Sequence, residues 1–187
     1  TSLNHVLITI QNLEDNPKSD IQAINGISFK LSTGQTVGSI ASSSALKRTI
    51  NSTAIGDYSD AGPSATNWLY KQAGLGVEIT NIGNAMAKQT LIGDPNGSNA
   101  YAAANGSIAG SVHNPFLAGV ATFDLLINGV TAATTIDALR FEFGTTSGTN
   151  VTGEKQAAVP EPSTFAMLAI GGLTVLAGRR LNRKARS

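Results

Sequence analysis

Apolar and polar residues alternate with a period of two along several short stretches of the chain. The clearest examples are Val6 to Gln11, Ala121 to Ile127 and Leu139 to Phe143. This period is typical of β-strands that bury one face. The pattern predicts strands over residues 6–11, 27–31, 37–40, 46–50, 77–79, 91–92, 121–127 and 139–143.

Turn-forming residues separate these stretches at short intervals. Asn128-Gly129 indicates a hairpin or a bend, and residues 51–65 lack periodicity and predict a long loop. Short strands with frequent turns favour an all-β domain over residues 1–144, an antiparallel β-sandwich of jelly-roll-like type. Residues 145–158 carry Gly148 and Gly153 without an apolar pattern, which predicts a flexible linker.

The pattern changes after Pro162. Residues 163–178 form an uncharged, mostly apolar run, which as a helix would extend roughly 24 Å against a hydrocarbon core of about 30 Å. Its glycines are common in membrane helices, and the cations that follow favour a cytoplasmic position for the C-terminus. We therefore expect a single transmembrane helix, with a buried helix of a soluble domain as the alternative. The basic tail consists of Arg179, Arg180, Arg183, Lys184 and Arg186.

Two prolines stand directly before the apolar run, in Pro160-Glu161-Pro162. They make this short stretch stiff and extended. The order of Pro-Glu-Pro, a short apolar helix and an arginine-rich end over residues 159–187 resembles the PEP-CTERM sorting signal of exosortase substrates. The resemblance implies export by the Sec route and a transient anchor in the inner membrane of a Gram-negative bacterium. It also implies processing by an exosortase at or near Pro-Glu-Pro, and delivery to the cell surface or the exopolysaccharide matrix.

Charge and cysteine content narrow the function classes. Five of the thirteen bases lie in the basic tail, so residues 1–160 carry eight bases against eleven acids. This mildly acidic body argues against a nucleic-acid partner. The chain has no cysteine, which excludes disulfides and thiol nucleophiles. Sec export requires a signal peptide; we expect it to have been removed or to lie outside this numbering.

Candidate catalytic residues are few. His5 and His113 are the two histidines, and no Gly-x-Ser-x-Gly motif is present. We interpret His113 as a turn residue beside Pro115, and we expect neither enzymatic activity nor a cofactor.

Two stretches are candidate binding sites. Asp94, Asn96 and Ser98 imitate the start of a calcium loop, although Asn99 replaces the expected glycine and a plain turn is the favoured interpretation. Trp68 and Tyr70 would share one face of a strand, where they could stack on sugar rings or, as the favoured alternative, pack in the core.

Three function classes follow. The leading hypothesis is an exported structural protein of the cell surface or exopolysaccharide (biofilm) matrix, which self-assembles or contacts exopolysaccharide. The alternative is a carbohydrate-binding module acting in that matrix. A hydrolase is the third and least favoured class.

Overall fold

The computed structural model describes residues 3–83, 88–110, 112–146 and 149–153, and all of these belong to one β-rich unit. Within these residues there is no α-helix and only one short 3₁₀ helix, η1 (Asp20–Gln22). The strands are β1 (His5–Gln11), β2 (Ile24–Leu31), β3 (Gly38–Ile50), β4 (Tyr58–Ser64), β5 (Leu69–Lys71), β6 (Val77–Thr80), β7 (Leu91–Ile92), β8 (Phe116–Ile127), β9 (Ile136–Phe143) and β10 (Asn150–Gly153). The prediction of an all-β domain is confirmed.

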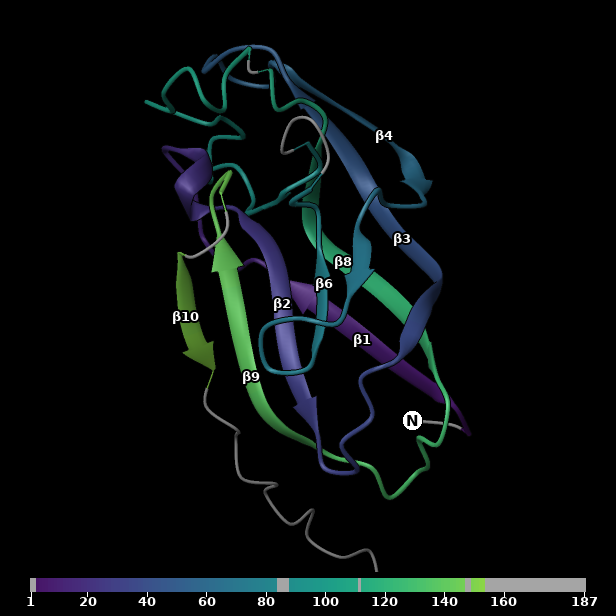
Figure 1. Ribbon diagram of the computed structural model, residues 1–187. Coiled ribbons are helices and arrows are strands. Elements are labelled where there is room, and N and C mark those ends of the chain that lie inside the picture. The colour runs from purple at the N-terminus through teal and green to yellow at the C-terminus, as the bar shows by residue number, and fades with distance from the viewer. Residues whose placement is uncertain (1–2, 84–87, 111, 147–148, 154–187) are drawn as a thin grey trace, which may run out of the picture. The chain divides into compact units, whose positions relative to one another are not determined.

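The strands form one hydrogen-bonded sheet with two arms. One arm has the order β10-β9-β2-β6-β5 and the other β1-β8-β3-β4, and β7 joins them by pairing with both β2 and β8. Figure 1 shows β1, β8 and β3 running obliquely to β2 and β9. The β7–β8 pair is parallel, so the sheet is mixed, and the prediction of a purely antiparallel jelly-roll-like sandwich is corrected on this point.

The two arms enclose the main core. Its side chains come from alternate positions of facing strands, for example Ile8 of β1, Phe29 of β2 and Phe123 of β8. Each of these residues is at most 8 % exposed. Alternation places one face of each strand inward, which is why the period-two pattern of the sequence identified these strands.

A second, loop-side core lies where the two arms meet. It consists of Ala23, Ile50, Ile92, Tyr101, Ile108 and Phe116. In β7 and β8 consecutive apolar residues divide between the two cores, since Leu91 and Leu117 belong to the main core. Successive side chains of a strand point to opposite faces, so the sheet is buried on both faces here.

Glycine at position 119 marks the point where β8 changes partners. β8 pairs with β7 up to Ala118 and with β1 from Val120 onward. Gly119 lies between them with φ +64°, a left-handed conformation that favours glycine. The residue therefore lets one long strand serve both arms.

Two sequence-based expectations fail in the connecting regions, and one alternative that the sequence left open is decided. The strands expected separately over 37–40 and 46–50 are one strand, because β3 runs through Ser42 to Ser44, which pair with β8. The long loop expected over 51–65 contains β4, an exposed strand at the edge of the sheet. Of the two interpretations of Asn128-Gly129, the bend is correct and the hairpin is not, since β8 and β9 are not neighbours.

The end of the domain also extends further than expected. β10 pairs with β9 from Asn150 to Gly153, inside the range 145–158 predicted as a flexible linker. That part of the range is a strand. The predicted transmembrane helix and the sorting residues lie outside the described residues. No helix among the described residues is long and apolar enough to cross a membrane.

Candidate functional site

An arginine on β3 organises the most extensive polar network of the described domain. Arg48 lies opposite Asp60 of β4 in the strand register, and its Nε and Nη2 donate to the two carboxylate oxygens at 2.7 and 2.8 Å. Its Nη1 donates to the Tyr101 hydroxyl at 2.9 Å. The guanidinium carbon lies 4.5 Å from the centre of the Tyr58 ring. The Arg48 side chain is only 8 % exposed.

The electrostatics of this network favour the charged arginine. Burial opposes the charge, but the hydrogen bonds with Asp60 and Tyr101 outweigh it and raise the pKa of Arg48 above its ordinary value. Burial raises the pKa of Tyr101 to about 12, so its hydroxyl stays protonated and donates to the Gly93 carbonyl at 3.0 Å. The groups thus satisfy one another. The network fixes the loop containing Tyr101 at the loop-side core.

A second polar group lies on the outer face of the other arm. Glu78 of β6 and Glu142 of β9 flank the central strand β2, where Ser28 is opposite Glu78 and Gly26 is opposite Glu142. The two glutamates are 9 % and 8 % exposed. Burial first, and then the negative charge of Glu78, raise the pKa of Glu142, and Arg140 and Lys71 oppose the shift.

The β5–β6 loop covers part of this carboxylate pair. A Cβ placed on Gly74 would lie 2.8 Å from the Ser28 hydroxyl, so the loop backbone lies directly against β2. The Ser28 hydroxyl is buried and has no hydrogen-bond partner within the described residues. A carboxyl of raised pKa beside a second carboxylate is an arrangement that acid–base catalysts use. Here the loop closes over Ser28 instead of leaving a cleft, and the pair carries no catalytic assignment.

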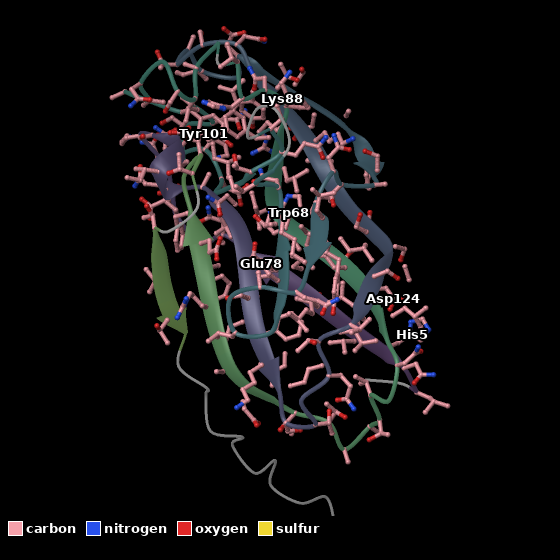
Figure 2. All side chains as sticks on the ribbon, in the orientation of Figure 1. His5, Trp68, Glu78, Lys88, Tyr101 and Asp124 are labelled. Carbon is pink, nitrogen blue, oxygen red and sulfur yellow. The ribbon has the colours of Figure 1, made fainter. Side chains whose placement is uncertain are left out.

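The aromatic residues predicted to share a strand face both lie at the core, although Trp68 directly precedes β5 and only Tyr70 belongs to it. Trp68 is 4 % exposed, and its ring centre lies 5.1 Å from that of Phe123. Its indole N–H donates to the Gln89 carbonyl at 2.8 Å. Tyr70 packs against the main core and donates its hydroxyl to the Thr36 carbonyl. Figure 2 shows Trp68 within the domain. The sugar-stacking interpretation is therefore wrong for Trp68.

The calcium-loop candidate folds as a turn. The side-chain oxygen of Asn96 accepts hydrogen bonds from the backbone N–H groups of Ser98 and Ala100, a typical use of asparagine in turns. The Asp94 Oδ1 atom lies 3.5 Å from Arg48 Nη1. The backbone of Asp94 forms an isolated parallel β-bridge with that of Asp15. Among the described residues no group of three or more acidic or histidine side chains could hold a metal ion.

The two histidines lie in separate parts of the domain. His5 Nδ1 is 2.8 Å from Asp124 Oδ1 across the β1–β8 pair, and Figure 2 shows this pair at one margin of the sheet, away from Tyr101. His113 Nε2 is 3.4 Å from Asp20 Oδ2. His113 lies in a turn, as the sequence predicts, just before the cis peptide bond between Asn114 and Pro115.

Sequence reasoning missed both polar groups of the described domain. Glu78 and Glu142 each stand between apolar residues of an alternating strand, so the sequence predicts that their side chains point away from the core. The sequence does not predict that both strands flank β2, because this depends on the topology of the sheet. The pairing of Arg48 with Asp60 was missed because β4 itself was not predicted.

Comparison with known proteins identifies a sorting motif at the C-terminal end of the sequence. Residues 158–184 match the PEP-CTERM protein-sorting motif. The motif implies an exported protein that transits the membrane, and the enzyme that processes proteins with this motif is an exosortase. No curated protein and no solved structure matches the chain.

Proposed function

We propose that this chain is a structural protein of the cell surface or extracellular matrix, delivered there by its PEP-CTERM signal. The observation that carries the proposal is the motif match over residues 158–184, joined to a β-domain that has its own core. The β-domain acts through its folded surface, and we propose no catalytic role for it. The sorting signal acts as a substrate tag and is not part of the mature function.

Each part of the signal has a physical task in this proposal. The stiff Pro160-Glu161-Pro162 element presents extended backbone to the exosortase. The apolar run 163–178 holds the chain transiently in the inner membrane, and the glycines it contains are tolerated there. The five cations from Arg179 to Arg186 keep the C-terminus cytoplasmic, which leaves the β-domain on the outer side.

The proposal is tested by the double variant Pro160→Ala and Pro162→Ala. We expect the β-domain to remain folded while the protein accumulates in the inner-membrane fraction. A matched control is Pro63→Ala, which removes a proline from the exposed edge strand β4 and should leave sorting unchanged. Mass spectrometry of the C-terminus of the extracellular form gives a second readout. An extracellular form that retains Arg179 to Arg186, or normal release of the double variant, would overturn the sorting assignment.

The carbohydrate-binding alternative loses its main support in the structure. Trp68 is buried and Tyr70 packs against the main core, so this pair offers no stacking surface. We therefore put forward the structural role alone. Titration with matrix polysaccharide should leave the emission of Trp68 unchanged.

A further inference from the structure

Four strands of the described sheet have a neighbour on one side only: β1, β4, β5 and β10. Open edges are templates for pairing with another chain, and proteins protect them by shortness, charge, proline or bulges. β5 and β10 contain three and four residues. β4 contains Asp60 and Pro63 and meets β3 through a register shift. These three edges are protected in the usual ways.

β1 has none of these protections. It contains seven residues, His5-Val-Leu-Ile-Thr-Ile-Gln11, without proline, glycine, aspartate, glutamate, lysine or arginine. Its register with β8 is regular throughout. Leu7 at the centre of the strand is 71 % exposed. A long, regular, uncharged edge strand with an exposed apolar residue is suited to pairing with another strand.

The backbone groups that face this open edge can be identified. Asn4 and Asn12, which flank β1, both bond to the β8 side, through Ile127 N to Asn4 O at 2.8 Å and Asn12 N to Gly119 O at 2.9 Å. Hydrogen-bonded and non-bonded positions alternate along an antiparallel pair. The even-numbered residues therefore bond to β8, while His5, Leu7, Thr9 and Gln11 direct their N–H and C=O groups outward. Within the described part of the chain, no other segment bonds to this edge.

We propose that the open edge of β1 pairs in antiparallel fashion with β1 of a second copy of this chain, around a two-fold axis at Ile8. In this register Leu7 is opposite Thr9 of the partner subunit, and His5 is opposite Gln11 of the partner subunit. Every outward N–H and C=O of the strand then finds a partner. Residues opposite each other point to the same face of a sheet, so the two cores stay on one side and the sheet continues through both chains.

The strand itself favours a second copy over a foreign partner. The register places no like charges opposite one another, and an edge paired with itself about a two-fold axis is the self-complementary contact of symmetric dimers. The pairing deepens the proposed structural role, because it gives the exported domain a way to associate. It does not depend on the sorting signal, so the two proposals can fail separately.

Cysteine cross-linking tests the register in the full-length chain, because the natural sequence contains no cysteine. Leu7→Cys and Thr9→Cys variants, one carrying a tag that changes its gel mobility, are mixed in detergent and mildly oxidised. Opposed residues of a hydrogen-bonded pair lie within the range of a disulfide. We expect the mixed dimer to form several-fold faster than either homodimer. Val151→Cys on the exposed edge strand β10 is the matched control and should cross-link slowly. Equal rates for all variants would overturn the proposal.

A second experiment separates β1 pairing from association through other segments. Thr9→Pro removes one outward N–H and leaves the bonds to β8 in place, whereas Thr9→Val keeps the N–H and a similar volume. We expect light scattering to show a dimer for Thr9→Val and a monomer for Thr9→Pro, with the emission of buried Trp68 reporting that both are folded. Leu7→Lys, at an exposed position, should also give a monomer.

The outcomes distinguish the two proposals. The compact unit Thr1–Lys155 contains both cores, so it should dimerise like the full chain. A dimer that persists in Thr9→Pro and Leu7→Lys, or that disappears when residues 156–187 are removed, would overturn the β1 pairing. Failure of the Pro160→Ala and Pro162→Ala variant to change localisation would affect the sorting proposal alone.

Discussion

The two cores of the domain are built by different means. The main core is apolar and comes almost entirely from alternate positions of regular strands. The loop-side core combines strand ends with residues of irregular segments, such as Tyr101 and Ile108, and the buried Arg48 network lies beside it. A regular strand needs only hydrophobic burial to fix its face. A loop must also satisfy its polar groups when it covers a core, which is the task of Arg48, Asp60 and Tyr101.

The largest effect is expected in the main core. Phe123→Ala removes a fully buried ring that packs against Trp68, and should lower the free energy of unfolding by about 3–5 kcal/mol. Urea denaturation followed by Trp68 fluorescence measures the change. The matched control is Leu126→Ala on the same strand, which is 39 % exposed and should cost about 0.5 kcal/mol or less. Similar losses for the two variants would contradict the assignment of the core face.

The next effect tests the polar network of the loop-side core. Asp60→Ala leaves the buried guanidinium of Arg48 without its carboxylate, and should cost about 2–3 kcal/mol, because Asp60 itself is partly exposed. Arg48→Met should cost less, since Asp60 can then hydrate. The stability lost in the double variant should be well below the sum of the losses in the two single variants, as expected for residues in direct contact. Additive losses in a double-mutant cycle would show that the pair is not coupled.

A smaller change concerns the Tyr101 hydroxyl. Tyr101→Phe removes the donor to Gly93 and the acceptor of Arg48, and should cost about 1–2 kcal/mol. The pKa of Tyr101 in the folded protein, about 12, lies above its ordinary value of 10, so the folded state holds this proton more tightly than the unfolded state. The stability that this adds is lost as the pH rises from 10 through 12. Urea midpoints across this range should fall more steeply for the natural protein than for Tyr101→Phe. Parallel curves would mean that Tyr101 does not cause the alkaline loss.

The smallest effect lies on the outer face of the arm that covers the main core. Burial and then Glu78 raise the pKa of Glu142 above the ordinary 4.5, so the folded state holds this proton more tightly than the unfolded state. The contribution of Glu142 to stability is present at pH values below the ordinary pKa, and it is lost as the pH rises through the raised pKa of the folded state. The stability of Glu142→Gln relative to the natural protein should therefore increase with pH over that window. The exposed Asp137→Asn on the same strand controls for the change in net charge. A relative stability that falls with pH would contradict the assigned shift.

Most of the main core could be predicted from the sequence because its strands alternate. Val6, Ile8 and Ile10 mark β1, and Phe123 and Leu125 mark β8. The failures have physical causes. Pairing with β8 carries β3 through Ser42 to Ser44, which separate the two strands expected over 37–40 and 46–50. Pro63 is tolerated in β4 because that strand lies at an edge.

The candidate sites also differ in whether they depend on local sequence or on long-range contacts. The sorting signal depends on the order of residue types in one short segment, so it could be recognised without a structure. The direction of the face shared by Trp68 and Tyr70 depends on strands far away in the sequence, among them β8 with Phe123. Likewise, Glu78 and Glu142 become neighbours of β2 only through the topology. Local patterns cannot supply such long-range neighbours.

The register of the first strand has a consequence for the biogenesis of this protein. His5 pairs with Leu126, and β2 pairs with β9 as far as Phe143. A chain threaded through a translocation channel with its N-terminus first would thus release β1 long before β8 arrives. The domain cannot close until nearly all of it has emerged, so it stays unfolded and transportable while it crosses. The sorting signal begins only a few residues after β10, so the domain becomes able to close on the far side at about the time when the apolar run enters the membrane.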